Sequence, residues 1–160
     1  LSKESTIENV HTKDVTTEFG EFKLNVWRDV IFDEYHFSLT KGSPEKVDVP
    51  MVRVQTQSVL QDTLGIDEIG KKWSIRKSLQ KIADEGTGVF VLINHRDAKT
   101  YWLSNLKDEN VEPKRNRRVI GIGSQILRAI GLNKIKVLGT PTKYSGLSGF
   151  NIEIEGFIDE

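Results

Sequence analysis

Cysteine is absent from the 160-residue sequence. Without thiols the chain cannot form disulfide bonds, use a cysteine nucleophile or hold zinc on cysteine ligands. An excess of charge of either sign is absent too, because 23 Lys and Arg residues balance 23 Asp and Glu residues. No overall field therefore favours nucleic acid or an anionic membrane, and we expect neither as a partner.

Long hydrophobic runs are also missing. No apolar stretch approaches the ~20 residues that cross a bilayer, and the N-terminus does not resemble a signal peptide. We therefore expect a cytoplasmic protein. The length fits a single domain over residues 1–160 with a real hydrophobic core. Because the chain starts at Leu1 and not at Met, we expect a tag remnant or a C-terminal fragment of a longer protein.

The first half of the sequence has the character of β-strands. Residues 6–15 are rich in strand-forming residues, and residues 21–26 and 35–40 alternate polar with apolar side chains, as in a half-buried strand. Turn residues separate these segments. A further strand is predicted over residues 49–55, so this half is expected to form an antiparallel sheet or a small barrel.

The second half mixes helices with buried strands. Ser74 is a candidate N-cap for a helix that ends before Gly86. The continuous apolar run over residues 89–93 is typical of a strand buried on both faces. A second helix is expected near residues 126–132. Strands are predicted over residues 134–138 and 150–154. The helix–strand order predicts an α/β (α+β) domain with a mixed sheet behind the β-rich half.

The polar segment between these helices is expected to be irregular. Residues 97–118 include Pro113 and a basic cluster, so we predict a solvated loop or a mobile insertion. Gly121-Ile122-Gly123 follows, but it lacks the third glycine and the preceding strand of a dinucleotide-binding motif. We interpret its glycines as close packing at the start of the second helix.

Four segments, in order along the chain, resemble the GTP cyclohydrolase II domain of riboflavin biosynthesis. They are TEFGEF at 17–22 with WRD at 27–29, VRV at 52–54, LQKIADEGTGV at 79–89, and GIGSQILRAIGLNKIKVLGTPTKYSGLSG at 121–149. The chain is most similar to the form found as the C-terminal half of bifunctional proteins, behind a dihydroxybutanone phosphate synthase domain. The resemblance implies that family's fold and an N-terminal synthase domain as partner in the same protein.

The zinc site of that family is not matched. There, zinc on three cysteines activates a water molecule for attack on GTP, but an ungapped alignment places Ser58, Ile69 and Lys71 at the cysteine positions. Serine is a poor zinc ligand, isoleucine is none, and the lysine charge repels the cation. We therefore expect no cofactor and predict that zinc is absent.

Other family positions are partly retained. Arg118 matches the family's nucleophilic arginine, whereas Asn116 replaces an aspartate proposed as general base, and an amide cannot take up a proton at neutral pH. We therefore assign no catalytic residue. By the same resemblance, Arg53, Thr140 and Lys143 are candidate nucleotide- or phosphate-binding residues. The Glu-Gly-Arg segment that holds GTP in the family is absent.

These losses lead to a functional hypothesis. We expect a GTP cyclohydrolase II-like domain that does not open the GTP ring and serves as a structural, regulatory or dimerisation domain, within a homodimeric protein. The full-length protein is expected to be a dihydroxybutanone phosphate synthase. The alternatives are a sensor domain that binds GTP or another phosphate compound, and, less favoured, an active GTP cyclohydrolase II variant.

Overall fold

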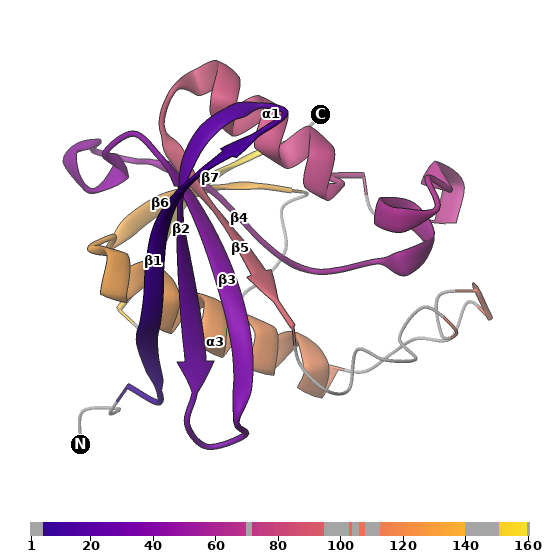
Figure 1. Ribbon diagram of the computed structural model, residues 1–160, viewed down its shortest axis with the longest axis horizontal. Coiled ribbons are helices and arrows are strands. Elements are labelled where there is room, and N and C mark those ends of the chain that lie inside the picture. The colour runs from indigo at the N-terminus through magenta and orange to yellow at the C-terminus, as the bar shows by residue number, and fades with distance from the viewer. Residues whose placement is uncertain are drawn as a thin grey trace.

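The computed structural model describes residues 5–69, 72–94, 103, 106–107, 113–139 and 151–159. Within this part, one seven-stranded sheet runs in the order β1-β2-β3-β5-β4-β6-β7 (Figure 1). The strands are β1 (Ile7–Thr17), β2 (Gly20–Asp29), β3 (Glu34–Lys41), β4 (Met51–Thr56), β5 (Gly88–Ile93), β6 (Lys134–Leu138) and β7 (Glu153–Ile158). The helices are α1 (Ile75–Glu85), α3 (Pro113–Ile130) and the short η1 (Pro44–Lys46), η2 (Val59–Thr63) and η3 (Asp67–Ile69).

The sheet is mixed, which confirms the predicted fold class. Strands β1, β2, β3 and β5 pair antiparallel, whereas β5, β4, β6 and β7 pair in parallel. The two halves meet because β3 pairs with β5, which lies beside β4. Of the two alternatives for the first half, the antiparallel sheet is confirmed for β1, β2 and β3 and the small barrel is wrong, because these strands continue into the same sheet and β4 pairs in parallel.

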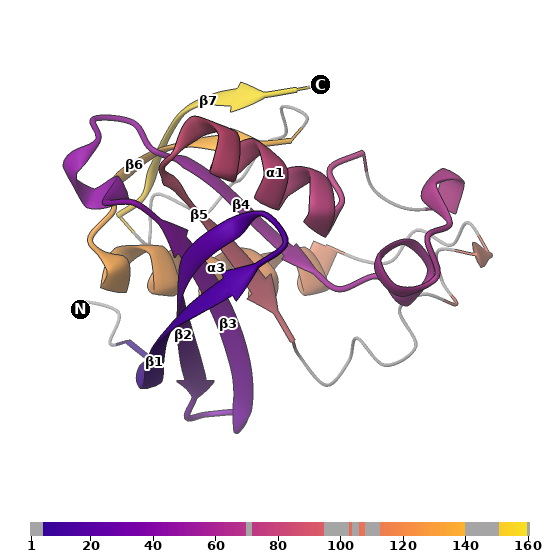
Figure 2. The same cartoon turned by 45° about the horizontal axis from the view of Figure 1, so that its top comes forward.

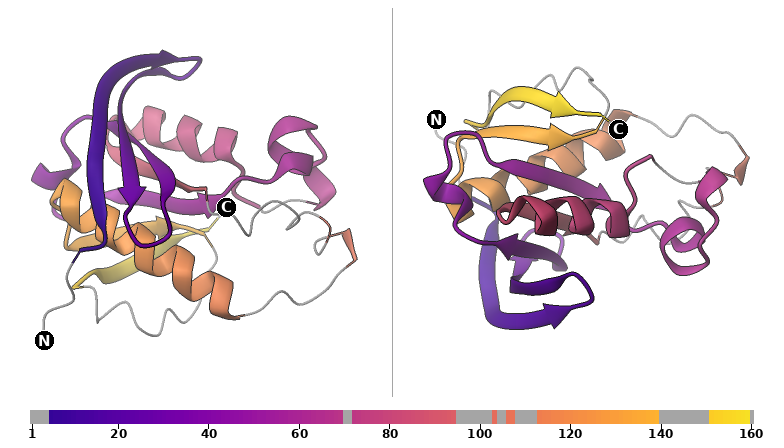
Figure 3. Two further views of the ribbon diagram at one scale, coloured as in Figure 1. Left: turned by 60° about the horizontal axis from the view of Figure 1, so that its bottom comes forward. Right: turned by 90° about the horizontal axis from the view of Figure 1, so that it is seen from above.

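Two helices cover opposite faces of the sheet, as the views in Figures 2 and 3 show. Strand β5 supplies both cores, because successive side chains point to opposite faces. Val89, Val91 and Ile93 belong to the cluster that includes the apolar face of α3. Phe90 belongs to the cluster under α1. The prediction of a strand buried on both faces is confirmed.

Helix α1 begins and ends as its sequence predicts. The Ser74 hydroxyl accepts a hydrogen bond from the backbone N–H of Lys77 at 3.1 Å, which satisfies one free donor of the first turn. Gly86 follows the helix with φ +85°, a left-handed conformation that glycine adopts without steric cost.

Helix α3 differs from the prediction at its start. It begins at Pro113, so residues 113–118 are helical and not a loop. Proline fits this position because the first-turn N–H groups have no partner within a helix. Gly123 consequently lies in the helix interior, where an added Cβ would meet Val54 Cγ1 at 2.8 Å. Close packing is therefore confirmed, but at the middle of a helix and not at its start.

The last strand is also displaced from its predicted position. It covers Glu153–Ile158, whereas residues 150–154 were expected. The rest of the predicted 97–118 loop lies mostly outside the described residues. None of the helices in the described ranges has the length and apolar character needed to cross a lipid bilayer.

Gly123→Ala tests the contact between α3 and β4. An alanine in a helix normally adds stability, but here its methyl group overlaps Val54, so we expect a loss of about 1–3 kcal/mol in unfolding free energy. Urea denaturation measures this loss. In the Val54→Ala background, which makes room for the methyl group, the same change should cost less. Equal costs in both backgrounds would contradict the packing argument.

Candidate functional site

Strand β3 buries its polar side chains. Glu34, His36 and Ser38 alternate along the strand and are only 5%, 0% and 1% exposed. The register places Asp29 opposite Glu34 and Trp27 opposite His36 on β2. Trp27 Nε1 donates a hydrogen bond to Ser38 Oγ at 2.9 Å. Because buried polar groups are costly without partners, this row of side chains is a candidate site.

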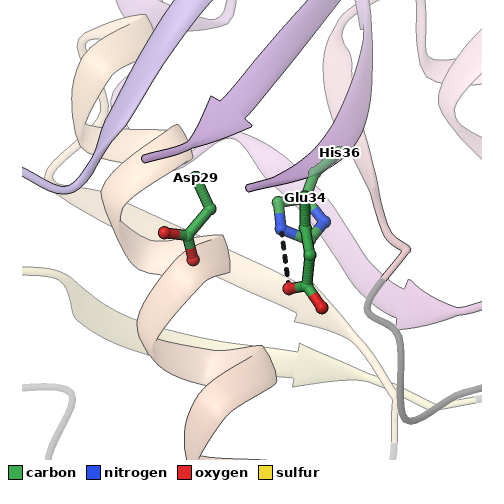
Figure 4. Close-up of side chains that lie close together, drawn as sticks. All are labelled: Asp29, Glu34 and His36. Carbon is green, nitrogen blue, oxygen red and sulfur yellow. Dashed lines mark ion pairs between the residues drawn. The ribbon is translucent and has the colours of Figure 1, made fainter. Parts of the chain in front are cut away.

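Glu34 lies at the centre of the cluster. Its Oε1 atom accepts a hydrogen bond from Nη2 of Arg118, which reaches over from α3. The same oxygen is 4.0 Å from Nε2 of His36, the contact drawn as a dashed line in Figure 4. The Arg118 guanidinium also lies over the Phe32 ring, 4.0 Å from its centroid. The buried carboxylate is thus held between a guanidinium and an imidazole.

Three residues of the cluster are of the types that bind metal ions in proteins. One ligand atom each from Asp29, Glu34 and His36 lies within 4.8 Å of the others. However, His36 Nδ1 accepts the backbone N–H of Asn94 at 2.9 Å, so a neutral imidazole carries its proton on Nε2, the nitrogen that faces Glu34. That nitrogen offers no lone pair to a cation. With the Arg118 charge also paired to Glu34, the cluster fits an ion-pair network better than a resident metal.

Arg53, a predicted phosphate-binding residue, lies within strand β4, opposite Phe90 of β5. Its guanidinium donates hydrogen bonds to Gln55 Oε1 at 2.7 Å, to the carbonyl of Leu138 at 3.0 Å and to the carbonyl of Trp73 at 3.2 Å. These bonds join β4, β6 and the segment before α1. A phosphate contact by Arg53 stays a prediction, as it does for Thr140 and Lys143, which lie outside the described residues.

Two of the three positions aligned with zinc ligands lie at the ends of short helices. Ser58 Oγ accepts the backbone N–H of Gln61 at 3.3 Å and caps η2, while Ile69 ends η3. Lys71 lies outside the described residues. A capping hydroxyl and an aliphatic side chain do not fit a zinc ion, so we derive no zinc chemistry for this chain. The absence of zinc and of other cofactors stays a prediction.

The sequence identified Arg118 but not its partners. Asn116 lies in α3, and its side chain is not described. Glu34, His36 and Asp29 were missed, although Asp29 belongs to the WRD segment that carried the family resemblance. The available signal was a charged residue and a histidine at alternate positions of one strand. Only the helix that packs above them shows that this face is buried.

The fold and this cluster can now be compared with known proteins. The sequence model of the GTP cyclohydrolase II family matches residues 8–159. The chain therefore belongs to the GTP cyclohydrolase II family.

Relatives of known name are longer than this chain. A protein of Pseudomonas aeruginosa is 29% identical, aligned with 99% of this chain and 45% of its own length. One of Neisseria meningitidis serogroup B is 32% identical, with 96% and 43% covered. Both are named 3,4-dihydroxy-2-butanone 4-phosphate synthase. The riboflavin biosynthesis protein RibBA of Aquifex aeolicus is 29% identical over 96% of this chain and 42% of its own length.

A solved structure agrees with the fold. The crystal structure of RibBX, described as a two domain 3,4-dihydroxy-2-butanone 4-phosphate synthase from A. baumannii, matches with a TM-score of 0.66 and 26% identity. The match covers 99% of this chain and 42% of that one. The chain thus spans less than half the length of these proteins.

These names correct the functional hypothesis from the sequence. Relatives that align with nearly the whole chain are named 3,4-dihydroxy-2-butanone 4-phosphate synthase, which contradicts the hypothesis of a degenerate GTP cyclohydrolase II domain with a structural or regulatory role. The sensor and active-cyclohydrolase alternatives gain no support from them. The error arose because the lost zinc ligands bear only on GTP ring opening, whereas the expectation of a dihydroxybutanone phosphate synthase as the full-length protein rested on the family resemblance and agrees with these names.

Glu34→Gln and Arg118→Met test the buried ion pair. Removing one partner leaves the other charge buried, so we expect Arg118→Met to cost about 3–5 kcal/mol in unfolding free energy. Glu34→Gln should cost less, because the Arg118 side chain is 21% exposed and can hydrate, whereas Glu34 is 3% exposed.

Chemical denaturation of both variants and of the double variant gives the coupling energy. We expect the double variant to be more stable than the sum of the single losses predicts, because no unpaired charge remains. Strictly additive losses would show that the two side chains do not stabilise each other.

Proposed function

We propose that this chain is part of a 3,4-dihydroxy-2-butanone 4-phosphate synthase that acts in riboflavin biosynthesis. The observation that carries the proposal is the 29–32% identity, over 96–99% of the chain, to proteins with that name. The RibBA relatives, which are named as riboflavin biosynthesis proteins, support the same pathway. The similarity to the RibBX structure supports it as well.

The chain is proposed to be the C-terminal, GTP cyclohydrolase II-family domain of this protein, behind an N-terminal synthase domain. Two facts support the arrangement. The matched relatives are more than twice as long as the region they share with this chain, and RibBX is described as having two domains. The same proposal has three further parts. The protein forms a homodimer, it is bifunctional, and it lies in the cytoplasm.

The contacts of two described residues support one further part of the proposal. Glu34 is engaged by Arg118 beneath α3, and Arg53 donates to two backbone carbonyls and a glutamine. A catalytic acid or base must reach a proton of the substrate, and these groups face the protein interior. We therefore propose that the reacting atoms of the substrate meet residues of the synthase domain and not the Glu34 cluster.

Product formation tests the proposal. The intact protein, purified as the cell makes it, is incubated with a panel of phosphorylated sugars of four or more carbons, because the product is a phosphorylated four-carbon ketone. We expect mass spectrometry to detect 3,4-dihydroxy-2-butanone 4-phosphate. A pentose phosphate would also have to release a one-carbon product, which is measured in parallel.

Two controls sharpen this assay. The Pseudomonas aeruginosa relative serves as the positive reference. A parallel incubation with GTP follows formate release. If the relative forms the product while the intact protein does not, the proposal fails, and formate released from GTP in the same samples would indicate a cyclohydrolase instead.

A further inference from the structure

The turn between β2 and β3 exposes a row of apolar side chains. Val30, Ile31 and Phe32 are 46%, 65% and 50% exposed, and Tyr35 at the start of β3 is 46% exposed. We call these four residues the tip surface. Tight turns normally carry glycine, asparagine, aspartate or proline, and three consecutive exposed apolar residues are unfavourable in water. The turn projects beyond α3 at the lower edge of Figure 1, and Phe32 stays half exposed although Arg118 of that helix contacts its ring.

The tip surface is held in one conformation. The buried Asp29 carboxylate accepts the backbone N–H groups of Ile31 at 3.0 Å and Phe32 at 3.4 Å. Asp33 closes the turn with φ +53°, and its carboxylate accepts a hydrogen bond from Arg28 Nε at 2.9 Å. This bond is the main reason that the pKa of Arg28 is raised. An apolar surface that is ordered before binding loses little entropy when a partner covers it.

Contacts on the two sides of the turn extend this order. Arg118 of α3 lies over one face of Phe32, 4.0 Å from the ring centroid. On the opposite face of the sheet, Val26 and Phe37 are paired half-buried residues that point the same way as Tyr35. Exposed apolar side chains therefore lie at the turn itself and on the face of the neighbouring strands away from α3, and the aromatic ones among them suit an interface.

Resting on the proposed function, we propose that the tip surface docks into an apolar pocket on the synthase domain of the same protein. Size favours this partner over a second copy of the chain. Four half-exposed side chains, two of them aromatic, offer on the order of 300–400 Å². A stable contact between separate proteins needs about 800 Å² from each side, whereas a domain in the same polypeptide is present at an effective concentration near ~1 mM and needs less.

Charge also argues for a protein pocket. The charged residues beside the turn are paired with one another, since Arg28 contacts both Asp33 at 2.9 Å and Glu8 at 3.4 Å. This rim carries no positive excess that would draw it to an anionic membrane or to nucleic acid. The matched relatives, in turn, contain more than half of their length outside the region shared with this chain, which is enough to supply the partner domain.

Photo-crosslinking in the intact protein tests the contact. A benzophenone amino acid replaces Ile31 in one variant and Leu64 in a matched control. Leu64 follows η2, outside the tip surface, and is 63% exposed against 65% for Ile31. After irradiation, mass spectrometry identifies the linked peptides. We expect at least tenfold more linkage to synthase-domain peptides from position 31 than from position 64.

The other outcomes overturn the proposal. Linkage from position 31 to residues 5–159 of a second copy would assign the tip surface to self-association, and equal or absent linkage from both positions would show an open surface. The result is independent of the activity assay. An active synthase without the cross-link contradicts the docking alone, whereas a protein that forms no dihydroxybutanone phosphate contradicts the proposed function.

Discussion

The double-sided burial of strand β5 is the constraint on which the rest of the structure depends. Its side chains alternate between the core under α3 and the core under α1, so the two helices pack against opposite faces of the same strand. The strand also joins the two kinds of pairing, because β3 lies antiparallel on one side of it and β4 parallel on the other. Displacing this strand would therefore disturb both cores, because each face of it belongs to one of them.

The polar cluster beneath α3 follows from this packing. Once α3 covers the sheet, the inward positions of β3 are closed to water, and they carry Glu34, His36 and Ser38. Burial of a carboxylate is tolerated because Arg118 supplies the opposite charge. The same arginine lies over Phe32, so the helix, the ion pair and the β2–β3 turn form one connected unit. The tip surface is ordered partly as a result.

Much of the fold could be predicted, because patterns within short segments of the sequence identify most of its strands and helix ends. Alternation identified the early strands, the apolar run at 89–93 identified β5, and Ser74 and Gly86 marked the ends of α1. The site was harder to predict. In residues 35–40 the alternation is as regular for the polar as for the apolar side chains, and a strand usually buries the apolar set. Here Tyr35 is exposed and His36 is buried, because Trp27 of the neighbouring strand β2 and Arg118 of α3, which is distant in the sequence, lie on the same face as His36.

The sequence by itself determined the family, the mixed α/β class and the lack of cysteine ligands for zinc, since each depends on residue identity and short-range order. Only the tertiary structure decided that α3 starts at Pro113, that the missing side chain of Gly123 leaves room for Val54, and that Arg118 forms an ion pair with Glu34. These features arise from contacts between residues far apart along the chain. Their strength depends on distance and burial, which no local pattern encodes.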